Sequence, residues 1–552
     1  MRRVKGSSGM KIKTLEFFAA QLLCLLLVLG CSGKPAMASG ELRQPPNRVF
    51  GDWLVTNLAA EPATLNPITA VDAYAGAVNG YIYESLLKRD AKSLKLVPVL
   101  AKRWEISPDH LTYTFYLKKN IKWSDGEPFT SKDIVFSYER IMDPKVDAAP
   151  LRVYYQDITK VEAPDDYTIR FHYRVPYFLA LEMCGGIPIV AAHLFKKGED
   201  FNTSPIGRHP IGTGPYKMLE WKTGNRIVLV RNEHYWGQKP AIDRRVFKII
   251  TDSTVALQVL KQGGLDTMSL DPIQWARETE NKRFTEKFRK ISYYQPLYRF
   301  IGWNCRRAIF SDKRVRQAMT MLVPRELILK KILFGLGAIV TGPFYINSPD
   351  YDKDIKPFAY DPKAALALLK SAGWNYPPGK YHLEKDGKPF KFEFLIPSGP
   401  KFALQIATIL KENLHEIGID MSIQRLEWAV FLQKINDDDF DACALGWSLG
   451  WENDPYQVWD SSQAIKGGSN FVGFKNAEAD KLIVAARKEF DPVKRRKMYY
   501  RLQEIIHDEQ PYTFLFTPMA LEAVSRRFQN VVVYPMGLDS LYWWVPKAEQ
   551  KY

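Results

Sequence analysis

Short strand patterns alternate with amphipathic helix patterns along most of the chain, and this alternation limits the fold more than any other feature. Residues 111–117 and 167–173 alternate apolar and polar side chains with a period of two, which predicts half-buried β-strands. Residues 53–55 predict a first strand, and helical periodicity covers residues 402–417 and 477–509. The mixture predicts an α/β or an α+β protein with more than one sheet.

Helix-start signals support the same class. Thr130 stands three residues before Asp133, which is the spacing of a capping box. Asp361-Pro362 predicts an N-cap followed by proline at the first helical position. A long helix expected over residues 312–334 is interrupted by Pro324.

The length and the charge narrow the class of protein. A chain of 552 residues is too long for one compact core and predicts two or three domains. Its formal net charge is +16, but the basic residues are spread along the whole length. A nucleic-acid binder usually concentrates them on one element, so we expect a solvated basic surface and no nucleic-acid partner. Attraction to an anionic membrane face stays open.

The amino-terminal segment resembles an export signal. Basic residues precede an apolar run over residues 17–29, which only Gln21 interrupts. This pattern is typical of a secretory signal peptide. The run is shorter than the roughly 18 residues of a membrane-spanning helix, and no later segment is long and apolar enough to span. Met10 is an alternative start to Met1, because basic residues follow it directly.

Two cleavage sites compete at the end of this segment. Gly30-Cys31 resembles a bacterial lipobox, which implies a signal over residues 1–31 and a lipid on the thiol of Cys31. An ordinary small-x-small site ends at Ala38 and predicts a soluble periplasmic protein instead. Residues 32–47 are rich in Gly, Pro, Ser and Lys and predict a flexible spacer. The type of host envelope stays open.

Three cysteines remain beyond the signal segment: Cys184, Cys305 and Cys443. Their scattered spacing predicts neither a metal knuckle nor a disulfide-stapled scaffold. We expect buried free thiols. A disulfide between Cys305 and Cys443, both expected on strands of one domain, is the open alternative.

A series of short motifs follows in order along the chain. They occupy residues 61–67, 83–87, 98–109, 123–138, 212–216, 310–318, 360–364 and 372–374. One of them, Gly212-Thr213-Gly214-Pro215-Tyr216, suits a tight crossover where the backbone must bend. Taken together, the series resembles the family 5 solute-binding proteins of ABC transporters, which include dipeptide, oligopeptide and nickel receptors. The resemblance covers roughly residues 50–545.

The resemblance implies a two-lobed periplasmic-binding-protein-like fold (type II, cluster C-like) with a hinge and an extra domain in one lobe. A discontinuous domain I is expected over residues 48–88, 206–298 and 525–552. Domain II is expected over residues 89–205 and domain III over residues 299–524. Most of the motifs are scaffold and identify the fold without identifying the ligand.

The segment over residues 440–460 is expected to line the cleft. In the peptide receptors, an Asp three residues after a Trp pairs with the ammonium group of the ligand. Here Trp447 is followed at that position by Gly450, so strict di- or tripeptide recognition is in doubt. A buried cation needs a carboxylate partner, and the acids at hand are Glu452, Asp454 and Asp460.

The remaining candidates are aromatic walls and two edge residues. We expect Trp447, Trp451, Tyr456 and Trp459 to offer broad apolar surfaces with a polar edge, although some of them would pack in the core of the lobe instead. The predicted ligand-binding residues are Glu61, Trp447, Trp451, Asp454, Tyr456, Trp459 and Asn470. For Asp454 and Glu61, the alternative is a role in shaping a loop.

No catalytic motif emerges from the sequence. The chain lacks a Gly-x-Ser-x-Gly elbow, a phosphate-binding loop and a His-Glu-x-x-His motif, and we expect no enzyme, cofactor or metal. The resemblance implies a monomeric, exported receptor for a peptide that closes about a hinge and serves the permease and ATPase subunits of an ABC importer. Two alternatives stay open: a receptor for another solute such as a chelated metal or a sugar, and a peptidase or chaperone on the same fold.

Overall fold

The computed structural model describes residues 48–70, 72–196, 198–398 and 401–552. The predictions for the signal peptide, the lipobox at Cys31, the cleavage site at Ala38 and the spacer lie outside the described residues. No helix in the described part is long and apolar enough to cross a membrane.

A twelve-stranded sheet forms the largest element of the fold. Its strands, in spatial order, are β18 (Asp420–Leu426), β17 (Lys391–Pro397), β19 (Ala442–Ser448), β13 (Leu297–Trp303), β20 (Tyr512–Ser525), β11 (Thr267–Ser269), β1 (Trp53–Leu58), β10 (Arg244–Ile249), β9 (Arg226–Arg231) and β8 (Tyr216–Lys222). Two further strands, β12 (Phe288–Tyr294) and β14 (Gly337–Ile339), also pair with β20.

A separate antiparallel sheet and three hairpins complete the β-structure. The sheet contains β4 (Ala101–Ile106), β5 (Thr112–Leu117), β7 (Thr168–Tyr173) and β6 (Ile158–Asp165). The hairpins are β2 (Leu87–Arg89) with β3 (Leu96–Pro98), β15 (Glu384–Lys385) with β16 (Lys388–Pro389), and β21 (Val533–Tyr534) with β22 (Gly537–Leu538). The expected strands over residues 53–55, 111–117 and 167–173 correspond to β1, β5 and β7.

The helices at Ser131 and Pro362 begin where the local signals predict, and the helical pattern over residues 477–509 forms two helices. The bounds are α2 (Ala73–Ile82), α3 (Ser131–Met142), α4 (Ala149–Tyr155), α5 (Ala180–Gly185), α6 (Ser253–Lys261), α7 (Lys282–Thr285), α8 (Lys313–Met321), α9 (Arg325–Lys331), α10 (Pro362–Ser371), α11 (Lys401–His415), α12 (Trp428–Asn436), α13 (Tyr456–Trp459), α14 (Ala477–Lys488) and α15 (Pro492–Glu509). Thr130 and Asp133 form the predicted capping box of α3. Asp361 caps α10 by accepting a hydrogen bond from the backbone N–H of Ala364 at 2.9 Å. Pro324 separates α8 from α9.

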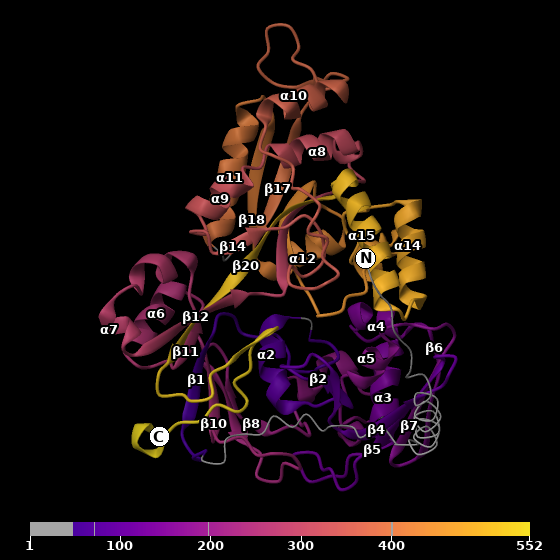
Figure 1. Cartoon of the computed structure of the whole chain (residues 1–552), viewed down its shortest axis with the longest axis vertical. Coiled ribbons are helices and arrows are strands. Elements are labelled where there is room, and N and C mark those ends of the chain that lie inside the picture. The colour runs from indigo at the N-terminus through magenta and orange to yellow at the C-terminus, as the bar shows by residue number, and fades with distance from the viewer. Residues whose placement is uncertain (1–47, 71, 197, 399–400) are drawn as a thin grey trace, which may run out of the picture. The chain divides into compact units, whose positions relative to one another are not determined.

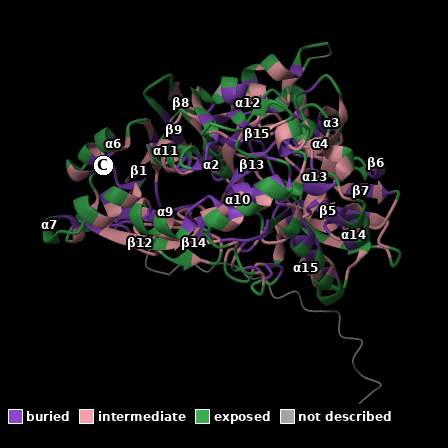
Figure 2. Cartoon of the chain, turned by 90° about the horizontal axis from the view of Figure 1, so that it is seen from above, coloured by how far each residue is buried: buried purple, intermediate pink, exposed green. Residues whose placement is uncertain are grey.

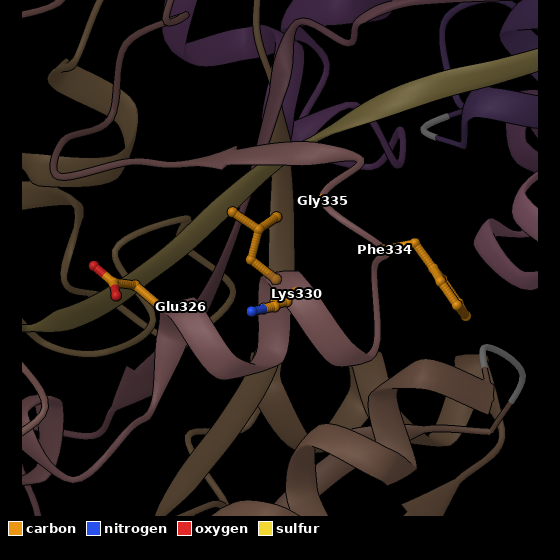
Figure 3. A pocket seen from close by; sticks show the side chains of 5 residues that line it. Glu326, Lys330, Phe334 and Gly335 are labelled. Carbon is orange, nitrogen blue, oxygen red and sulfur yellow. The ribbon is translucent and has the colours of Figure 1, made fainter.

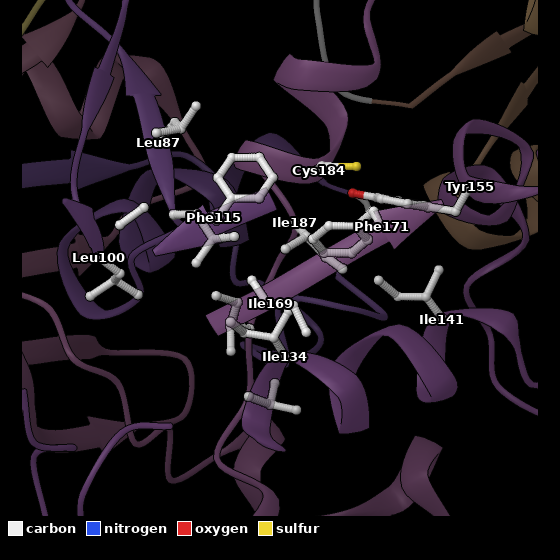
Figure 4. Close-up of a cluster of buried hydrophobic side chains, with 14 of the residues drawn as sticks. Leu87, Leu100, Phe115, Ile134, Ile141, Tyr155, Ile169, Phe171, Cys184 and Ile187 are labelled. Atoms are coloured by element: carbon white, nitrogen blue, oxygen red, sulfur yellow. The ribbon is translucent and has the colours of Figure 1, made fainter. Parts of the chain in front are cut away.

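The buried apolar side chains gather in cores that belong to two groups of elements. One core, drawn in Figure 4, lies around the four-stranded sheet and α3 and takes its residues from between Ile68 and Ile206. Smaller cores surround β1, β10 and the C-terminal half of β20. We call these elements together the first lobe. Two other cores lie around β13, β17 and β19 and define the second lobe. Figure 2 shows buried residues on the interior strands and exposed residues on the outer faces of the helices.

The chain crosses between the lobes at two neighbouring places. Residues 519–525 of β20 pair with β12, and residues 512–516 pair with β13, which follows β12 after only two residues. The backbone N–H of Gln295 donates to the carbonyl of Pro518 at 3.1 Å at this crossing. Figure 1 shows β20 passing between the two groups of elements. The packing therefore favours a boundary near Pro518, whereas the sequence placed it after residue 524.

Gly212 and Gly214 lie so close to neighbouring backbone atoms that no side chain fits there. The sequence instead suggested that they allow the backbone to bend. Neither Gly212 nor Gly214 has a positive φ. A Cβ atom at Gly212 would lie 1.9 Å from the carbonyl oxygen of Ile82, and one at Gly214 would lie 2.6 Å from the same oxygen. The Gly214 N–H donates to this oxygen at 2.9 Å. The motif thus holds its loop against the C-terminal end of α2.

The three cysteines of the described chain are free thiols, as expected. Cys184 and Cys443 are buried, and Cys305 is partly buried. Cys443 lies opposite Gly302 in the pairing of β19 with β13, so the chain reaches Cys305 only beyond the end of β13. The thiol of Cys305 instead lies 3.5 Å from the carbonyl oxygen of Trp303.

Candidate functional site

The predicted ligand-binding segment lies beside the crossing between the lobes. It begins in β19, continues through a loop over residues 449–455 and ends in α13. The backbone N–H of Leu449 donates to the carbonyl of Pro296 at 2.7 Å, and Pro296 lies between β12 and β13. Because this hydrogen bond fixes the start of the loop at the crossing, the loop side chains are positioned to contact both lobes.

Three of the predicted aromatic residues are partly exposed. The indole of Trp447 packs beside Phe471 with 6.1 Å between ring centroids, and its Nε1 donates to the hydroxyl of Tyr512 at 3.3 Å. Trp451 is half-buried in the loop. The ring of Tyr456 lies 4.4 Å from the guanidinium carbon of Arg487. These side chains retain surface that a ligand can contact.

Two other predicted residues belong to the interior of the second lobe. Trp459 is 1% exposed and packs against Tyr512 with 4.8 Å between ring centroids. Asn470 is fully buried, and its amide nitrogen donates to the carbonyls of Asp460 and Phe474 at 3.1 and 2.8 Å. Its oxygen accepts from the N–H of Phe474 at 3.0 Å. Both side chains therefore leave almost no surface for a ligand to contact.

Asp454 already has partners from both lobes. Its Oδ2 accepts a hydrogen bond from the hydroxyl of Tyr177, in the first lobe, at 2.9 Å. The same oxygen lies 2.9 Å from Nε of Arg487, in the second lobe, and the side chain is 1% exposed. Its Oδ1 accepts from the N–H of Tyr456 at 3.0 Å. Burial raises the pKa of Asp454, although the Arg487 charge and these hydrogen bonds oppose the rise.

The other two acids considered from the sequence are also engaged. Glu452 pairs with Arg89 of the first lobe and with Arg495 of the second lobe, each at 3.1 Å. Asp460 accepts hydrogen bonds at the start of the short helix over residues 461–463, from the N–H of Ser462 at 2.9 Å. A ligand ammonium group at Glu452 or Asp454 would share a carboxylate that already faces an arginine.

Further contacts extend this meeting of the lobes, which we call the lobe contact. The hydroxyl of Tyr154 donates to the side-chain oxygen of Gln457 at 2.6 Å, and the N–H of Phe178 donates to the carbonyl of Arg487 at 2.9 Å. The guanidinium of Arg495 lies 4.0 Å from the centre of the Phe178 ring. The lobe contact comprises Arg89, Tyr154, Tyr177 and Phe178 of the first lobe with Glu452, Asp454, Gln457, Arg487 and Arg495 of the second.

Glu61 is fixed within the first lobe. Its carboxylate accepts hydrogen bonds from Nε1 of Trp221 at 2.7 Å and from the N–H of Gly224 at 2.9 Å. Burial opposes ionisation, but these hydrogen bonds and Arg208 leave the pKa of Glu61 below its usual value. The described contacts of Glu61 are with the hairpin of β8 and β9 and with Arg208. They do not include the segment over residues 440–460.

A surface pocket lies away from the predicted residues. It has a volume of about 430 Å³ and lies between α9 and the turn that follows it, as Figure 3 shows. Its lining consists of Glu326, Leu329, Lys330, Phe334 and Gly335. In the described part of the chain, no group of three or more acidic, His or Cys side chains is arranged to hold a metal ion.

The sequence analysis missed the first-lobe partners of the site, Arg89, Tyr154 and Tyr177. Tyr177 lies 277 residues from Asp454 in the chain, and no local pattern identifies such a pair. Arg299 also lies near the lobe crossing, and the signal that the sequence offers for it is a charged residue within the otherwise apolar strand β13.

Comparison with known proteins identifies the family. The model of the bacterial extracellular solute-binding proteins, family 5 Middle, matches residues 95–468. The chain belongs to this family, as the motif series predicts. Proteins of this family act outside the cytoplasm.

The most similar relatives include binding proteins with different ligands. The oligopeptide-binding protein AppA of Bacillus subtilis is 32% identical, over 96% of this chain and 99% of its own. The structure of AppA in complex with a nonapeptide matches with a TM-score of 0.84 and 31% identity, covering 91% of this chain and all of that one. NikZ of Campylobacter jejuni, in complex with Ni(L-His), matches with a TM-score of 0.79 and 28% identity over 89% of this chain and 99% of that one.

Proposed function

We propose that this protein is the extracytoplasmic binding component of an ABC importer, and that it captures a peptide between its lobes and delivers it to the permease and ATPase subunits. The main support is the similarity along nearly the whole chain to AppA, which binds a nonapeptide in its solved structure. The relatives named above are binding proteins, which supports capture without catalysis.

Hinge closure is the mechanism that the lobe contact supports. The contact joins side chains of both lobes, and the described part of the chain crosses between the lobes at two adjacent places. A ligand that binds more tightly when the lobes meet shifts the population toward the closed state. In this proposal the lobe contact and the ligand together stabilise closure.

The predicted site residues take different roles in this proposal. Trp447, Trp451 and Tyr456 form an apolar wall with polar edges, which suits peptides of varied side chains. Trp459 and Asn470 hold that wall in place from the interior. Asp454 acts in closure, and Glu61 shapes the rim through its loop. The domain division over residues 48–88, 89–205, 206–298, 299–524 and 525–552 is part of the proposal, with the last boundary moved to about 518.

Native mass spectrometry of the purified protein tests the peptide proposal directly. We expect peptides of about nine residues to remain bound and to be released on denaturation. Added peptide at 100 times its dissociation constant should stabilise the fold by roughly 2.7 kcal/mol. The absence of a thermal shift with any peptide pool would rule out a peptide ligand. Cleavage of the added peptides in the presence of a chelator would favour the peptidase alternative.

A chelated metal is the second candidate ligand, because NikZ binds Ni(L-His) in its solved structure. A chelate that supplies most of its own donors does not need a cluster of protein ligands. Adding nickel with and without free L-histidine, and following the melting temperature, distinguishes this ligand from a peptide. Stabilisation that requires both components would replace the peptide proposal.

We also propose that the protein is monomeric and attached to the membrane by a lipid on Cys31. The lipobox-like Gly30-Cys31 supports the lipid, and a soluble form cleaved after Ala38 is the alternative. Light scattering of the protein without its signal segment tests the monomer. A mass that matches two chains would contradict it.

A further inference from the structure

Arg299 is a partly buried cation in the second lobe. It lies in β13, and no hydrogen bond or ion pair connects its guanidinium to any of the described residues. Its Nε is fully buried and unbonded, and burial lowers the pKa of the guanidinium. The fully buried arginines of the described chain all form side-chain hydrogen bonds. They are Arg245, Arg316, Arg325, Arg495 and Arg527.

Arg299 lies immediately beyond the crossing between the lobes. It is the third residue of β13, which begins only two residues after β12 ends. Its neighbours across the strands are Gly446 of β19 and Phe516 of β20. Arg299 and Tyr74 of α2, in the first lobe, interact electrostatically without forming a hydrogen bond, and the Arg299 charge lowers the pKa of Tyr74 against the larger effect of its burial. The guanidinium therefore lies where the two lobes face each other.

The neighbouring glycine makes room for this side chain. A Cβ atom at Gly446 would lie 2.9 Å from Cδ and 3.0 Å from Nη1 of Arg299. Gly446 does not have a positive φ, so its backbone does not require glycine. The close approach to Arg299, together with the carbonyl oxygen of Tyr298 at 2.9 Å, explains the absence of a side chain at this position.

An unpaired charge removed from water is costly, and proteins ordinarily pair it. The guanidinium fork matches a carboxylate, with two parallel N–H donors for two oxygens. We propose that Arg299 binds a carboxylate of the ligand between the lobes. This inference rests on the proposed function for the peptide, and it assigns the charged end of the peptide that the protein recognises. Glu452 and Asp454 are paired with arginines, so a ligand carboxylate, and not its ammonium group, is the principal anchor.

Matched peptide libraries test the assignment. Random nonapeptides with free C-termini, the same library as C-terminal amides, and a free-acid library without Asp and Glu are each offered to the protein, and bound peptides are identified by native mass spectrometry. A C-terminal anchor predicts capture of both free-acid libraries and poor capture of the amides. A side-chain anchor predicts that the amides are captured if they contain Asp or Glu.

Substitution of Arg299 gives the decisive comparison. Arg299→Gln is expected to lower affinity for the captured acid on the order of ten- to a hundredfold and to remove the discrimination against its neutral analogue. Arg299→Lys should restore part of the affinity. The ligand-free Arg299→Gln protein should melt no lower than wild type, because the change removes an unpaired charge. The matched control is Arg501→Gln, since Arg501 forms exposed ion pairs with Glu478 and Glu504.

The results separate this inference from the proposed function. Equal loss of acid and neutral ligands in Arg299→Gln, or a lower melting temperature of its ligand-free form, would show a structural role and overturn the inference. If wild type captures no peptide, the proposed function fails, and the carboxylate site is then tested with acetate, succinate and citrate. Stabilisation of wild type but not of Arg299→Gln supports the site, and the absence of any such difference overturns it.

Discussion

Glu522 is a partly buried acid without a cationic partner among the described residues. It lies in β20, and its carboxylate accepts a hydrogen bond from the hydroxyl of Ser269 at 2.6 Å. Within the described chain, no cationic side chain forms an ion pair with it. Burial raises the pKa of Glu522, and the Ser269 hydrogen bond only partly opposes this rise. The surroundings of Glu522 therefore favour its neutral form over its charged form.

Glu522→Gln is expected to increase the free energy of unfolding at neutral pH. A raised folded-state pKa means that the native protein binds the proton more tightly than the unfolded chain does. The cost is absent below about pH 4, where both states are protonated, and it grows as pH rises through the folded-state pKa. A folded-state pKa that lies one pH unit above the unfolded-state pKa corresponds to a cost of about 1.4 kcal/mol. Urea unfolding at pH 4 and pH 7.5 measures the difference, with the exposed Glu412→Gln as control. A variant that is less stable at pH 7.5 would contradict this account.

At the scale of elements, helix starts could be predicted and the partners of the site could not. The caps of α3 and α10 depend on residues three apart, so Thr130 with Asp133 and Asp361 with Ala364 are visible in the sequence. The family resemblance predicts that the segment around Trp447 lines the cleft, and in the structure this segment lies beside the lobe crossing. The partners of Asp454 come from elements that are distant in the sequence. The lack of a described partner for Arg299 depends on how β13 packs between β19 and β20. Neither follows from local spacing.

Tyr177→Phe should weaken ligand binding without disrupting either lobe. The change removes the hydroxyl that connects the first lobe to Asp454, and it leaves the Asp454–Arg487 pair in place. Loss of about 1 kcal/mol from the closed state corresponds to roughly a fivefold lower affinity for every ligand. Calorimetric titration with a captured peptide measures it.

The control for this variant is Tyr155→Phe, which removes a hydroxyl hydrogen bond of 3.1 Å to the carbonyl of Met183 inside the first lobe. It should reduce stability and leave affinity unchanged. Equal effects of the two variants on affinity would argue against a role for the lobe contact in closure. Asp454→Asn adds a second comparison: a loss confined to peptides with a free amino group would restore Asp454 as the ammonium anchor.

The contact between α2 and the loop of Gly214 makes a prediction of its own. In Gly214→Ala the new Cβ would meet the carbonyl oxygens of Ile82 and Tyr81 at 2.6 and 2.7 Å, and backbone atoms cannot easily move away. We expect a loss of about 1–3 kcal/mol in the free energy of unfolding. Gly76→Ala in α2 has no atom within 4 Å of its new Cβ and should gain up to about 1 kcal/mol. Urea unfolding of both variants measures the two free energies of unfolding. Similar free energies would show that the contact between Gly214 and the end of α2 does not limit stability.

At the scale of the whole molecule, two forces act toward the membrane. The full sequence has a formal net charge of +16, and loss of the five basic residues and one Glu of residues 1–30 would leave +12, which still attracts an anionic surface. The proposed lipid on Cys31 would instead insert hydrocarbon into the bilayer, where each buried CH₂ contributes about 0.8 kcal/mol. Salt separates these forces, because screening shortens the range of charge interactions to about 3 Å at 1 M while hydrocarbon insertion persists.

The full-length chain, expressed in a bacterium that lipidates exported proteins, is expected to stay with the membrane fraction after washing with 1 M salt. Cys31→Ser should be released under the same wash, because only screened charge would hold it. The control is Cys184→Ser, which changes a buried thiol of the folded part and leaves Cys31 intact.

Mass spectrometry of the mature N-terminus gives the independent readout. A wild-type N-terminus that follows Ala38, with both proteins released by salt, would establish the soluble form. Retention of Cys31→Ser at 1 M salt would require another anchor.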